Sequence, residues 1–580
     1  MKKKKWVVKE KISEDIVSQL LYNRGLRGKN AVADFFNSPA PEVVVAQYPN
    51  YLKRIDPDEV EKAVSLIKKA IDSGRPIVIH GDYDVDGICG AAILCQTLES
   101  FGAKVTPFIP DRFDEGYGLS TASIDKIRQV TISPLLITTD CGIGAIDEVK
   151  YAKSLGFQVI ITDHHAQRDT SPAQREHHAQ GENLPEADAI VWTDELAGAG
   201  VAYLLASRLA NEFTVHNSQF TANLGLVALA TIADVQPLTR VNRALVKQGL
   251  EELNPTRRVG LRELIKVAGL EGKEINTYEV GWMLGPRLNA SGRLGKASDS
   301  LKLLLTDDPT EGQEIAAKLN RLNQERQQLT LKAVEEARKE IAPLRQGFGG
   351  QVGNIIILDR TTWHEGIIGL VAGRIKKEFY RPAVIISKGE KISKGSARSI
   401  EGFNIVEALR HCSEFLLNTG GHPMAAGLTI ETEKIPQFKE KLAAVANERL
   451  TEEVLRPTLK IDLEAPLADL NWSLLKDLKK FEPFGVGNPR PTFLTKSVRI
   501  LDIRSVGGNG QHLKFRIRDV DDTTGQPCNH FPVIGFGFGE WAAELGRGDL
   551  VDIVYNFEEN HWNGRQTLQL KLKDLRKSNK

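Results

Sequence analysis

The sequence predicts an α/β protein in which a long helix joins two α/β domains and a small β-barrel follows at the C-terminal end. Three observations carry this prediction. Short apolar runs alternate with helical patterns from about residue 60 to residue 240, and the alternation resumes after residue 353. An unbroken helical pattern separates the two regions, and five short strand patterns follow residue 455. Short runs that are apolar on both faces and alternate with helices indicate a buried parallel sheet.

The composition excludes several classes of protein. The chain has 580 residues, of which 41% are hydrophobic and 26% are charged, as in an ordinary folded protein rather than a disordered, fibrous or membrane one. The longest apolar run, Leu224–Ala233, is too short to span a membrane. Five scattered cysteines without a CxxC pair favour a reducing compartment, and the basic N-terminus has no apolar signal-peptide core behind it. We therefore expect a soluble cytoplasmic protein with no membrane contact.

The first half of the chain predicts one α/β domain. Residues 1–50 predict a polar, partly helical arm. In the region 51–240, helices are expected at 60–71, 88–100, 145–155 and 224–233, and strands at 76–80, 104–109, 135–139 and 158–162. Region 241–345 connects this domain to the next and ends in a long helix from Asp307 to about Leu344. A coiled-coil seam is the alternative for that helix, but its apolar stripe lasts only about four heptads and Arg326 interrupts it.

The second half predicts one more α/β domain and the barrel. The glycine-rich segment Gln346–Gly353 follows the long helix and is expected to be a tolerated loop. Region 346–455 then continues with strand 354–358, helix 367–379 and strand 383–387. Region 456–580 contains strands at 492–501, 511–518, 533–537, 549–557 and 565–573, for which an OB-fold is the first expectation.

Acidic residues and histidines come directly after three of the predicted strands. These segments are His80-Gly-Asp82-Tyr-Asp84-Val-Asp86, Asp140 and Asp163-His164-His165. Because the carboxyl ends of parallel strands share one edge of a sheet, the three segments are expected to converge. A fourth acid, Asp234, ends the very apolar helix 224–233 and would lie at the rim of the core.

So many converging carboxylates require a cation. Oxygen ligands mixed with imidazole suit Mn²⁺, with Mg²⁺ as the alternative, and the lack of thiolates argues against structural zinc. A calcium loop is the competing interpretation of Asp82, Asp84 and Asp86, but the closing glutamate would fall on Ile93. His164-His165 alone would favour a capped, solvated turn. No GxxxxGK[ST] segment occurs, which excludes a P-loop.

A basic region predicts phosphate binding. The 76 basic and 75 acidic residues leave a net charge of +1, so any nucleic-acid surface must come from segregated charge. Residues 371–398 hold eight lysines and arginines against Glu378 and Glu390, a local charge of +6. A solvated helix face explains part of this set. It does not explain three segments that combine glycine or hydroxyls with strong donors: Lys394–Ser399, Gly420-Gly421-His422 and Gly285–Arg293.

These motifs resemble the DHH phosphoesterase family. His80-x-x-x-Asp84-x-Asp86, Asp140, Asp163-His164-His165 and Asp234 are similar to its four motifs, and Ser396-Ala-Arg398-Ser399 with Gly420-Gly421-His422 is similar to the companion DHHA1 domain. Within the family the chain is most similar, from about 50 to 575, to the bacterial single-strand-specific 5′→3′ exonucleases. The resemblance implies that region 51–240 is the DHH catalytic domain, 346–455 the DHHA1 substrate-binding domain and 456–580 a nucleic-acid-binding OB-fold.

The resemblance also implies residue roles. One metal ion would be held by His80, Asp84 and Asp140, and a second by Asp86, Asp140, His164 and Asp234. The catalytic group would be His165, Asp140 and Asp163, in which His165 meets the scissile phosphate and Asp163, like Asp82, orients the ligands. The substrate would be bound by Arg112, Tyr117, Arg287, Asn289, Arg293, Ser396, Arg398, Ser399, Gly421 and His422, with Arg112, Ser396 and Arg398 on the 5′-terminal phosphate.

The implied function is a two-metal phosphodiesterase that degrades single-stranded DNA 5′→3′ to nucleoside 5′-monophosphates in DNA repair and recombination. A single-strand-binding protein and a repair helicase are the implied partners. Two alternatives remain open: an oligoribonuclease or cyclic-dinucleotide phosphodiesterase, and a non-catalytic replication scaffold on the same fold. The chain departs from these exonucleases at Trp192–Glu195, where a longer Asn-Pro-rich stretch is usual, and in the His-rich polar segment upstream.

Overall fold

The structure, a computed structural model, describes residues 4–112, 114–166, 184–213, 223–347, 353–519, 530–562 and 564–578. The His-rich segment 171–183, most of the glycine-rich segment after the long helix, and Cys528 lie outside the described residues. The chain divides into two compact units. Unit 1 comprises Ala40–Gln236 and Leu245–Pro457, and unit 2 comprises Lys4–Pro39, Pro237–Ala244 and Thr458–Lys580.

Unit 1 begins with a five-stranded sheet in the order β3-β2-β4-β5-β6, and every pairing in it is parallel. The strands are β2 (Ile77–Gly81), β3 (Val105–Phe108), β4 (Leu135–Thr139), β5 (Gln158–Asp163) and β6 (Ala189–Trp192). All residues of β2 and β4 are buried, which agrees with the prediction of a sheet covered on both faces.

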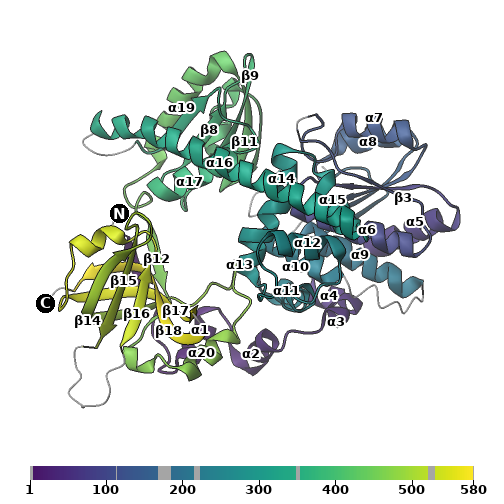
Figure 1. Cartoon of the computed structure of the whole chain (residues 1–580). Coiled ribbons are helices and arrows are strands. Elements are labelled where there is room, and N and C mark those ends of the chain that lie inside the picture. The colour runs from purple at the N-terminus through teal and green to yellow at the C-terminus, as the bar shows by residue number, and fades with distance from the viewer. Residues whose placement is uncertain are drawn as a thin grey trace. The chain divides into compact units, whose positions relative to one another are not determined.

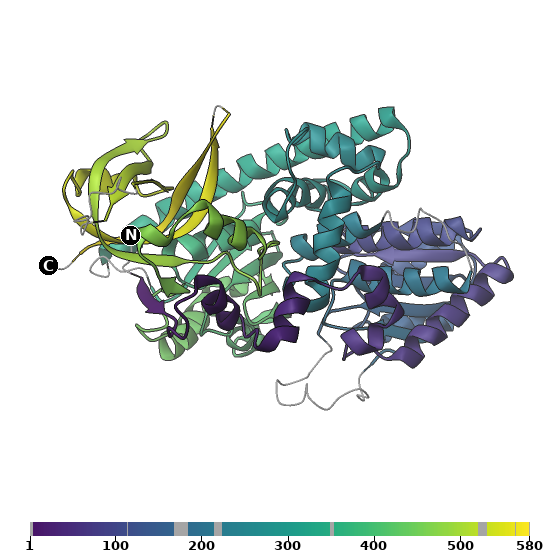
Figure 2. The ribbon, with the colours of Figure 1, turned by 90° about the horizontal axis from the view of Figure 1, so that it is seen from below.

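Helices cover the two faces of this sheet (Figure 2). Side chains of one face, such as Leu136 and Val159, pack with α7 and α8, while α6 and α9 contact the strands from the other face. The helices of this part are α3 (Pro41–Ala46), α4 (Tyr48–Tyr51), α5 (Pro57–Asp72), α6 (Val85–Ser100), α7 (Thr121–Val130), α8 (Ile146–Ser154), α9 (Gly198–Glu212) and α10 (Leu224–Ala233).

The predicted long helix is α16 (Pro309–Gly347), a continuous rod in Figure 1. Its first half packs on α12, α14 and α15, and its second half packs on α17. A π-helical turn, Val280–Leu284, runs directly into α14. The preceding helices are α11 (Arg240–Leu253), α12 (Val259–Val267), α13 (Thr277–Glu279), α14 (Gly285–Leu294) and α15 (Ser298–Leu305).

The second sheet of unit 1 has the order β10-β11-β9-β8-β7, in which only β7 and β8 are parallel. Its elements are β7 (Ile356–Arg360), α17 (Ile368–Phe379), β8 (Ala383–Ser387), β9 (Ile392–Arg398), α18 (Ile405–Arg410), β10 (Leu416–His422), β11 (Ala425–Glu431) and α19 (Ile435–Arg449). This confirms the second α/β domain after the long helix. No helix in the described ranges is both long and apolar enough to cross a membrane.

Unit 2 is built on a closed barrel. The strands follow the order β14-β15-β16-β18-β17, and β14 also pairs with β17, so the sheet closes on itself. The parallel β16–β18 pair and this order are those of an OB-fold, as predicted. The elements are β12 (Thr458–Ile461), β13 (Leu463–Glu464), α20 (Trp472–Lys479), β14 (Phe493–Val506), β15 (His512–Arg518), β16 (Phe531–Gly535), β17 (Leu550–Trp562) and β18 (Arg565–Lys577).

The N-terminal residues belong to this barrel unit, which differs from the expectation of a separate polar arm. β1 (Lys5–Val8) pairs in parallel with β12, and α1 (Ile16–Asn23) and α2 (Gly28–Phe36) follow it. Leu20, Leu21 and Phe35 are buried in the core that the barrel strands form. The physical reason is that these few apolar side chains find their partners about 450 residues away, a pairing that local pattern does not reveal.

Candidate functional site

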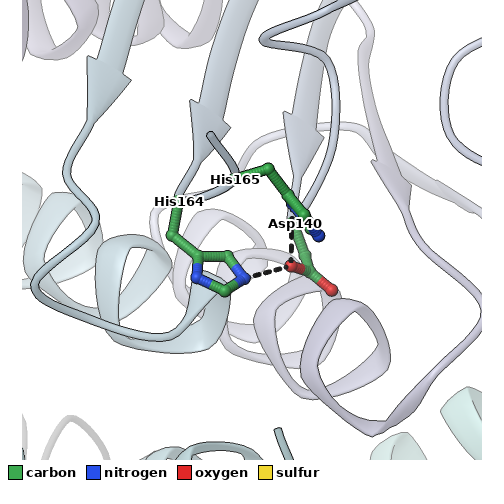
Figure 3. Close-up of side chains that lie close together, drawn as sticks. All are labelled: Asp140, His164 and His165. Carbon is green, nitrogen blue, oxygen red and sulfur yellow. Dashed lines mark ion pairs between the residues drawn. The ribbon is translucent and has the colours of Figure 1, made fainter. Parts of the chain in front are cut away.

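The predicted strand-end residues meet at one edge of the parallel sheet. β2, β4 and β5 are neighbours in the sheet, and each ends where its polar segment begins. His80 lies near the end of β2, Asp140 follows β4, and Asp163 ends β5. Figure 3 shows that Asp140, His164 and His165 point toward one another from these strand ends. The convergence expected from the sequence is therefore present.

His164 is the centre of the cluster. Its Nε2 lies 3.0 Å from Oδ1 of Asp140, 3.5 Å from Oδ2 of Asp86 and 3.8 Å from Oδ2 of Asp234. Three groups of side chains bring their ligand atoms within 4.8 Å of one another: Asp140 with His164 and His165, Asp86 with His164 and Asp234, and Asp82 with Asp84 and Asp140. Asp140 belongs to two of these groups, as a bridging ligand would.

Several of these atoms are buried without a hydrogen-bond partner among the described residues: His80 Nε2, Asp82 Oδ1, Asp140 Oδ1 and His164 Nε2. Leaving one such atom unpaired costs about 1–3 kcal/mol, and more for a charged group. All four atoms are carboxylate oxygens or imidazole nitrogens, the donors that hard and intermediate divalent cations take from proteins. The residues present therefore fit a divalent metal centre.

The pKa values of four acids in the cluster are raised. Burial, followed by the charge of Asp84, raises the pKa of Asp82 to about 8. Burial and the charges of Asp86, Asp84 and Asp82 raise the pKa of Asp140 well above its usual range. Burial also raises the pKa of Asp86, and it raises that of Asp234 to about 6. A cation among these oxygens would favour the ionised forms and lower each pKa.

The pKa values of the three imidazoles are shifted in opposite directions: those of His80 and His164 are lowered, and that of His165 is raised. Burial lowers the pKa of His80 to about 4, and burial together with the charge of His165 lowers that of His164 to about 4. Both rings are therefore neutral at pH 7, as a metal ligand must be. For His165 burial acts in the same direction, but its hydrogen bond with Asp163 and the charge of Asp163 outweigh burial and raise the pKa to about 9.

Asp163 orients His165. Its Oδ1 lies 2.8 Å from Nδ1 of His165 and accepts the backbone N–H groups of His164 and His165, and its Oδ2 accepts the N–H of Ile143. Nε2 of His165 lies 2.9 Å from the Tyr117 hydroxyl. Both oxygens of Asp163 are occupied, which fits the positioning role expected for it. Asp163 and Tyr117 thus fix the imidazole at its two nitrogens.

Backbone geometry positions Asp86 and Asp140. The carboxylate of Asp86 accepts the N–H groups of Gly198 and Ala199 at the start of α9, both at 2.7 Å. A Cβ on Gly198 would lie 2.6 Å from Cβ of Asp140, so only glycine fits there. Asp140 itself has φ 62, a left-handed conformation that aspartate and asparagine tolerate better than other side chains.

The remaining predicted ligands lie beside this cluster. Asp84 caps α6, because its Oδ1 accepts the N–H groups of Asp86 and Gly87. Nδ1 of His80 lies 3.6 Å from Sγ of Cys141, which leaves Nε2 as the atom available to a metal. The sequence reasoning missed Gln236, whose Nε2 donates to Asp234 and lies 3.2 Å from Nδ1 of His164. In the sequence, only its position two residues after Asp234 indicates that Gln236 could contact the cluster.

An arginine cluster borders the metal-binding residues. Burial, followed by the charges of Arg112, Arg326 and Arg398, lowers the pKa of Arg293 to about 10. Burial and Arg112 also lower the pKa of Arg398. The guanidinium of Arg112 lies 5.1 Å from the ring centroid of Tyr83. Cations that repel one another in a partly buried place are the signature of an anion-binding site.

Ser396 and Arg398 lie beside the first turn of α17. Nη1 of Arg398 donates to Oγ of Ser396, and a Cβ on Gly369 would lie 3.0 Å from Nη2 of Arg398 and 3.1 Å from Oγ of Ser396. The first turn of a helix also offers backbone N–H groups without intrahelical partners. Guanidinium, hydroxyl and helix N-terminus are three kinds of donor that bind phosphate, and this set of donors is called the anion pocket below.

The other predicted substrate-binding residues differ in what their side chains contact. Gly421 has φ 138 and His422 ends β10, close enough for its charge to act on His164. Arg287 donates to the Met283 carbonyl and to Asn320. Asn289 accepts the N–H of Val85 and so supports the start of α6.

Ser399 differs from its expected role as a substrate-binding residue. Its side chain is fully buried, and its hydroxyl donates to the Phe403 carbonyl. The physical reason is that β9 ends at Arg398, so the next residue turns into the core rather than toward the anion pocket.

Three family models match the chain. The DHH family N-terminal domain matches residues 76–231, the DHHA1 domain matches 352–448 and the RecJ OB domain matches 461–574. A single-stranded-DNA-specific exonuclease RecJ of Thermus thermophilus is 35% identical over 523 residues, which is 89% of this chain and 71% of the relative. The chain belongs to the RecJ family. The RecJ of Bacillus subtilis is 38% identical over 533 residues, which is 90% of this chain and 64% of that relative, slightly under two thirds of its length.

Solved RecJ structures share the fold. The crystal structure of RecJ from Thermus thermophilus in complex with Mn²⁺ has a TM-score of 0.79 and 29% identity, and covers 99% of this chain and 80% of that one. The complex of the same RecJ with Mg²⁺ has a TM-score of 0.71 and 28% identity, with 99% and 79% coverage. These relatives agree with the predicted order of DHH domain, long helix, DHHA1 domain and OB barrel.

Proposed function

We propose that the protein is a metal-dependent exonuclease that degrades single-stranded DNA from the 5′ end and releases nucleoside 5′-monophosphates. The observation that carries the proposal is the juxtaposition of two sets: buried, unpaired carboxylate and imidazole atoms around His164, and partly buried, mutually repelling arginines around Arg293. The first set suits divalent cations, and the second suits a phosphate chain. RecJ membership supports single-stranded DNA as the substrate.

The proposed metals are two Mn²⁺ ions, with Mg²⁺ as the alternative. His80, Asp84 and Asp140 would hold one ion, and Asp86, Asp140, His164 and Asp234 the other. Asp82 shares a group with Asp84 and Asp140, so it is a further candidate ligand for the first ion. When bound, two such ions supply an activated water and neutralise the phosphoryl oxygens.

The chain's own groups perform the remaining tasks. His165 is cationic below about pH 9, so it can offset charge on the scissile phosphate. Asp163 keeps the imidazole of His165 in one orientation through its Nδ1 contact. The pocket formed by Arg398, Ser396 and the start of α17 would hold the 5′-terminal phosphate and thereby set which bond is cut. Arg112 would share the 5′-terminal phosphate with this pocket, and Arg287, Arg293 and His422 would contact the following phosphates.

The test uses a 5′-phosphorylated single strand of about 30 nucleotides labelled at one end. With Mn²⁺, a 5′ label should appear at once as a mononucleotide, whereas a 3′ label should remain on a strand that shortens gradually. An Asp140→Asn variant is the matched control. If the protein cleaves only dinucleotides or cyclic dinucleotides, the small-substrate alternative holds. If it cleaves nothing but still binds single strands, the scaffold alternative holds.

Two further proposals rest on the sequence. A single-strand-binding protein and a repair helicase would present the strand, since the chain has no P-loop motif of its own. The proposed location is the cytoplasm, in keeping with the scattered cysteines.

A further inference from the structure

Two large aromatic side chains are exposed at the turn that packs on α10, the helix that ends at Asp234. The side chain of Trp282 is 69% exposed and that of Tyr278 is 60% exposed. Their ring centroids are 6.3 Å apart and their planes differ by 29°, so the two rings form one continuous apolar surface. Neither side chain has a part in the core, because the buried residues of this turn are Val280 and Leu284. Exposed aromatic surface of this kind marks a recognition site.

The local backbone holds the two rings on one side of the segment. Asn276 caps α13 and exchanges hydrogen bonds with Glu279, which fixes the start of the segment. The residues that follow form a π-helical turn, and such turns are rare and occur frequently at functional sites. Residues four apart lie on the same side of a helix, so Tyr278 and Trp282 face outward together.

This π-helical turn contacts the helix that ends at the proposed metal ligand Asp234 and the helix that carries two of the arginines. It packs on α10, the helix that ends at Asp234, and a Cβ on Gly281 would lie 3.7 Å from Ile232. At its C-terminal end the turn continues directly into α14, which carries Arg287 and Arg293. Arg287 donates to the carbonyl of Met283, the residue next to Trp282.

We infer that Tyr278 and Trp282 form a stacking platform for the bases of the single strand downstream of the scissile phosphate. This inference rests on the proposed function. The occupant is a nucleobase rather than a protein side chain, because the turn that carries Trp282 leads directly into α14, whose arginines would hold the phosphates of the same strand. Flat aromatic faces stack on any base, which suits an enzyme that must accept every sequence.

Equilibrium binding in EDTA tests the platform without hydrolysis. The ligand is a 5′-phosphorylated, fluorescein-labelled oligothymidylate of about 12 nucleotides. Trp282→Ala should weaken binding about 5- to 150-fold, the range measured for loss of one aromatic–base stack. Trp282→Phe, which keeps a ring, should retain most of the affinity. Ile132→Ala is the control, since Ile132 is 86% exposed in the same compact unit and should change binding by less than about twofold.

A series of ligands with one abasic position identifies the contact itself. The full chain should lose affinity when the base that stacks on the platform is missing, and Trp282→Ala should be insensitive at that position only. The same abasic profile in both proteins, or unchanged binding by Trp282→Ala, would overturn the inference and leave the pair as a docking surface for another macromolecule. Failure of the proposed function looks different, because the unaltered protein would then release no mononucleotides in Mn²⁺, whether or not it binds the strand.

Discussion

The pocket at the start of α17 allows a sharp test with two glycines of one helix. Gly369 lies beside Arg398 and Ser396, whereas a Cβ on Gly373 would meet nothing within 4 Å. Replacing either residue by alanine adds one methyl group to the same helix. Only the methyl at position 369 would occupy the space between guanidinium and hydroxyl, where a phosphate oxygen would lie about 2.8 Å from its donors.

The expected magnitude follows from these contacts. At 3.0 Å and 3.1 Å from Arg398 and Ser396, the new methyl group forces both side chains to move by a few tenths of an ångström and excludes one phosphate oxygen. Loss of a hydrogen bond to a charged group costs about 1.5–3 kcal/mol, which is about 10- to 150-fold in affinity. Gly369→Ala should therefore raise KM by that factor for 5′-phosphorylated strands, and much less for 5′-hydroxyl strands.

The assay is steady-state hydrolysis of one single strand with either a phosphate or a hydroxyl at its 5′ end, for both variants. Gly373→Ala should keep the ratio of the two KM values, because alanine within a helix is tolerated and touches nothing. An equal change of that ratio in the two variants, or none in either, would refute the assignment of this pocket to the 5′ phosphate.

Three other predictions follow from the metal centre and the fold. Asp140→Asn, which keeps a side chain suited to φ 62, should lower hydrolysis by more than about 100-fold and abolish the thermal shift caused by Mn²⁺, whereas the exposed Asp72→Asn should change neither. In EDTA the Tm should fall as the pH rises from 6.5 to 8, because Asp82 and His165, with folded pKa values of about 8 and 9, bind more protons in the folded state than in the unfolded state. A Tm that does not change with pH over this range would contradict these pKa values. A chain of residues 40–457 should elute without aggregates in gel filtration and have a raised KM for long strands, whereas residues 1–457, which expose Leu20, Leu21 and Phe35, should aggregate.

Much of the metal centre could be predicted because its signals are local. His80, Asp140 and Asp163 each end a strand whose apolar run is unmistakable, and neighbouring parallel strands bring their ends together without further information. Asp234 was recognisable in the same way, as a charge that ends the most apolar helix of the chain. The five barrel strands were predicted as short runs between turns, although β14, β17 and β18 extend to 14, 13 and 13 residues.

What could not be predicted depends on contacts between distant segments. The amides of Gly198 and Ala199 that hold Asp86 come from residues more than a hundred positions away, and a backbone donor has no sequence signature. Asn289 and Ser399 resemble ligand-binding residues by type, yet their hydrogen bonds serve α6 and the turn after β9. Whether a polar side chain faces a ligand or the protein is decided by the tertiary fold.

Unit 2 combines residues 4–39 with residues 458–580, and this separation along the chain has a consequence for biosynthesis. Lys4 donates to the carbonyl of Lys573, which is 569 residues further along the chain. At about 5–20 residues per second, β1, α1 and α2 must wait about half a minute to two minutes for the barrel that buries them. The parallel sheet of unit 1 is synthesised between these two parts of unit 2. Throughout that interval Leu20, Leu21 and Phe35 lack the barrel core that buries them, so residues 4–39 form an exposed apolar segment on the nascent chain.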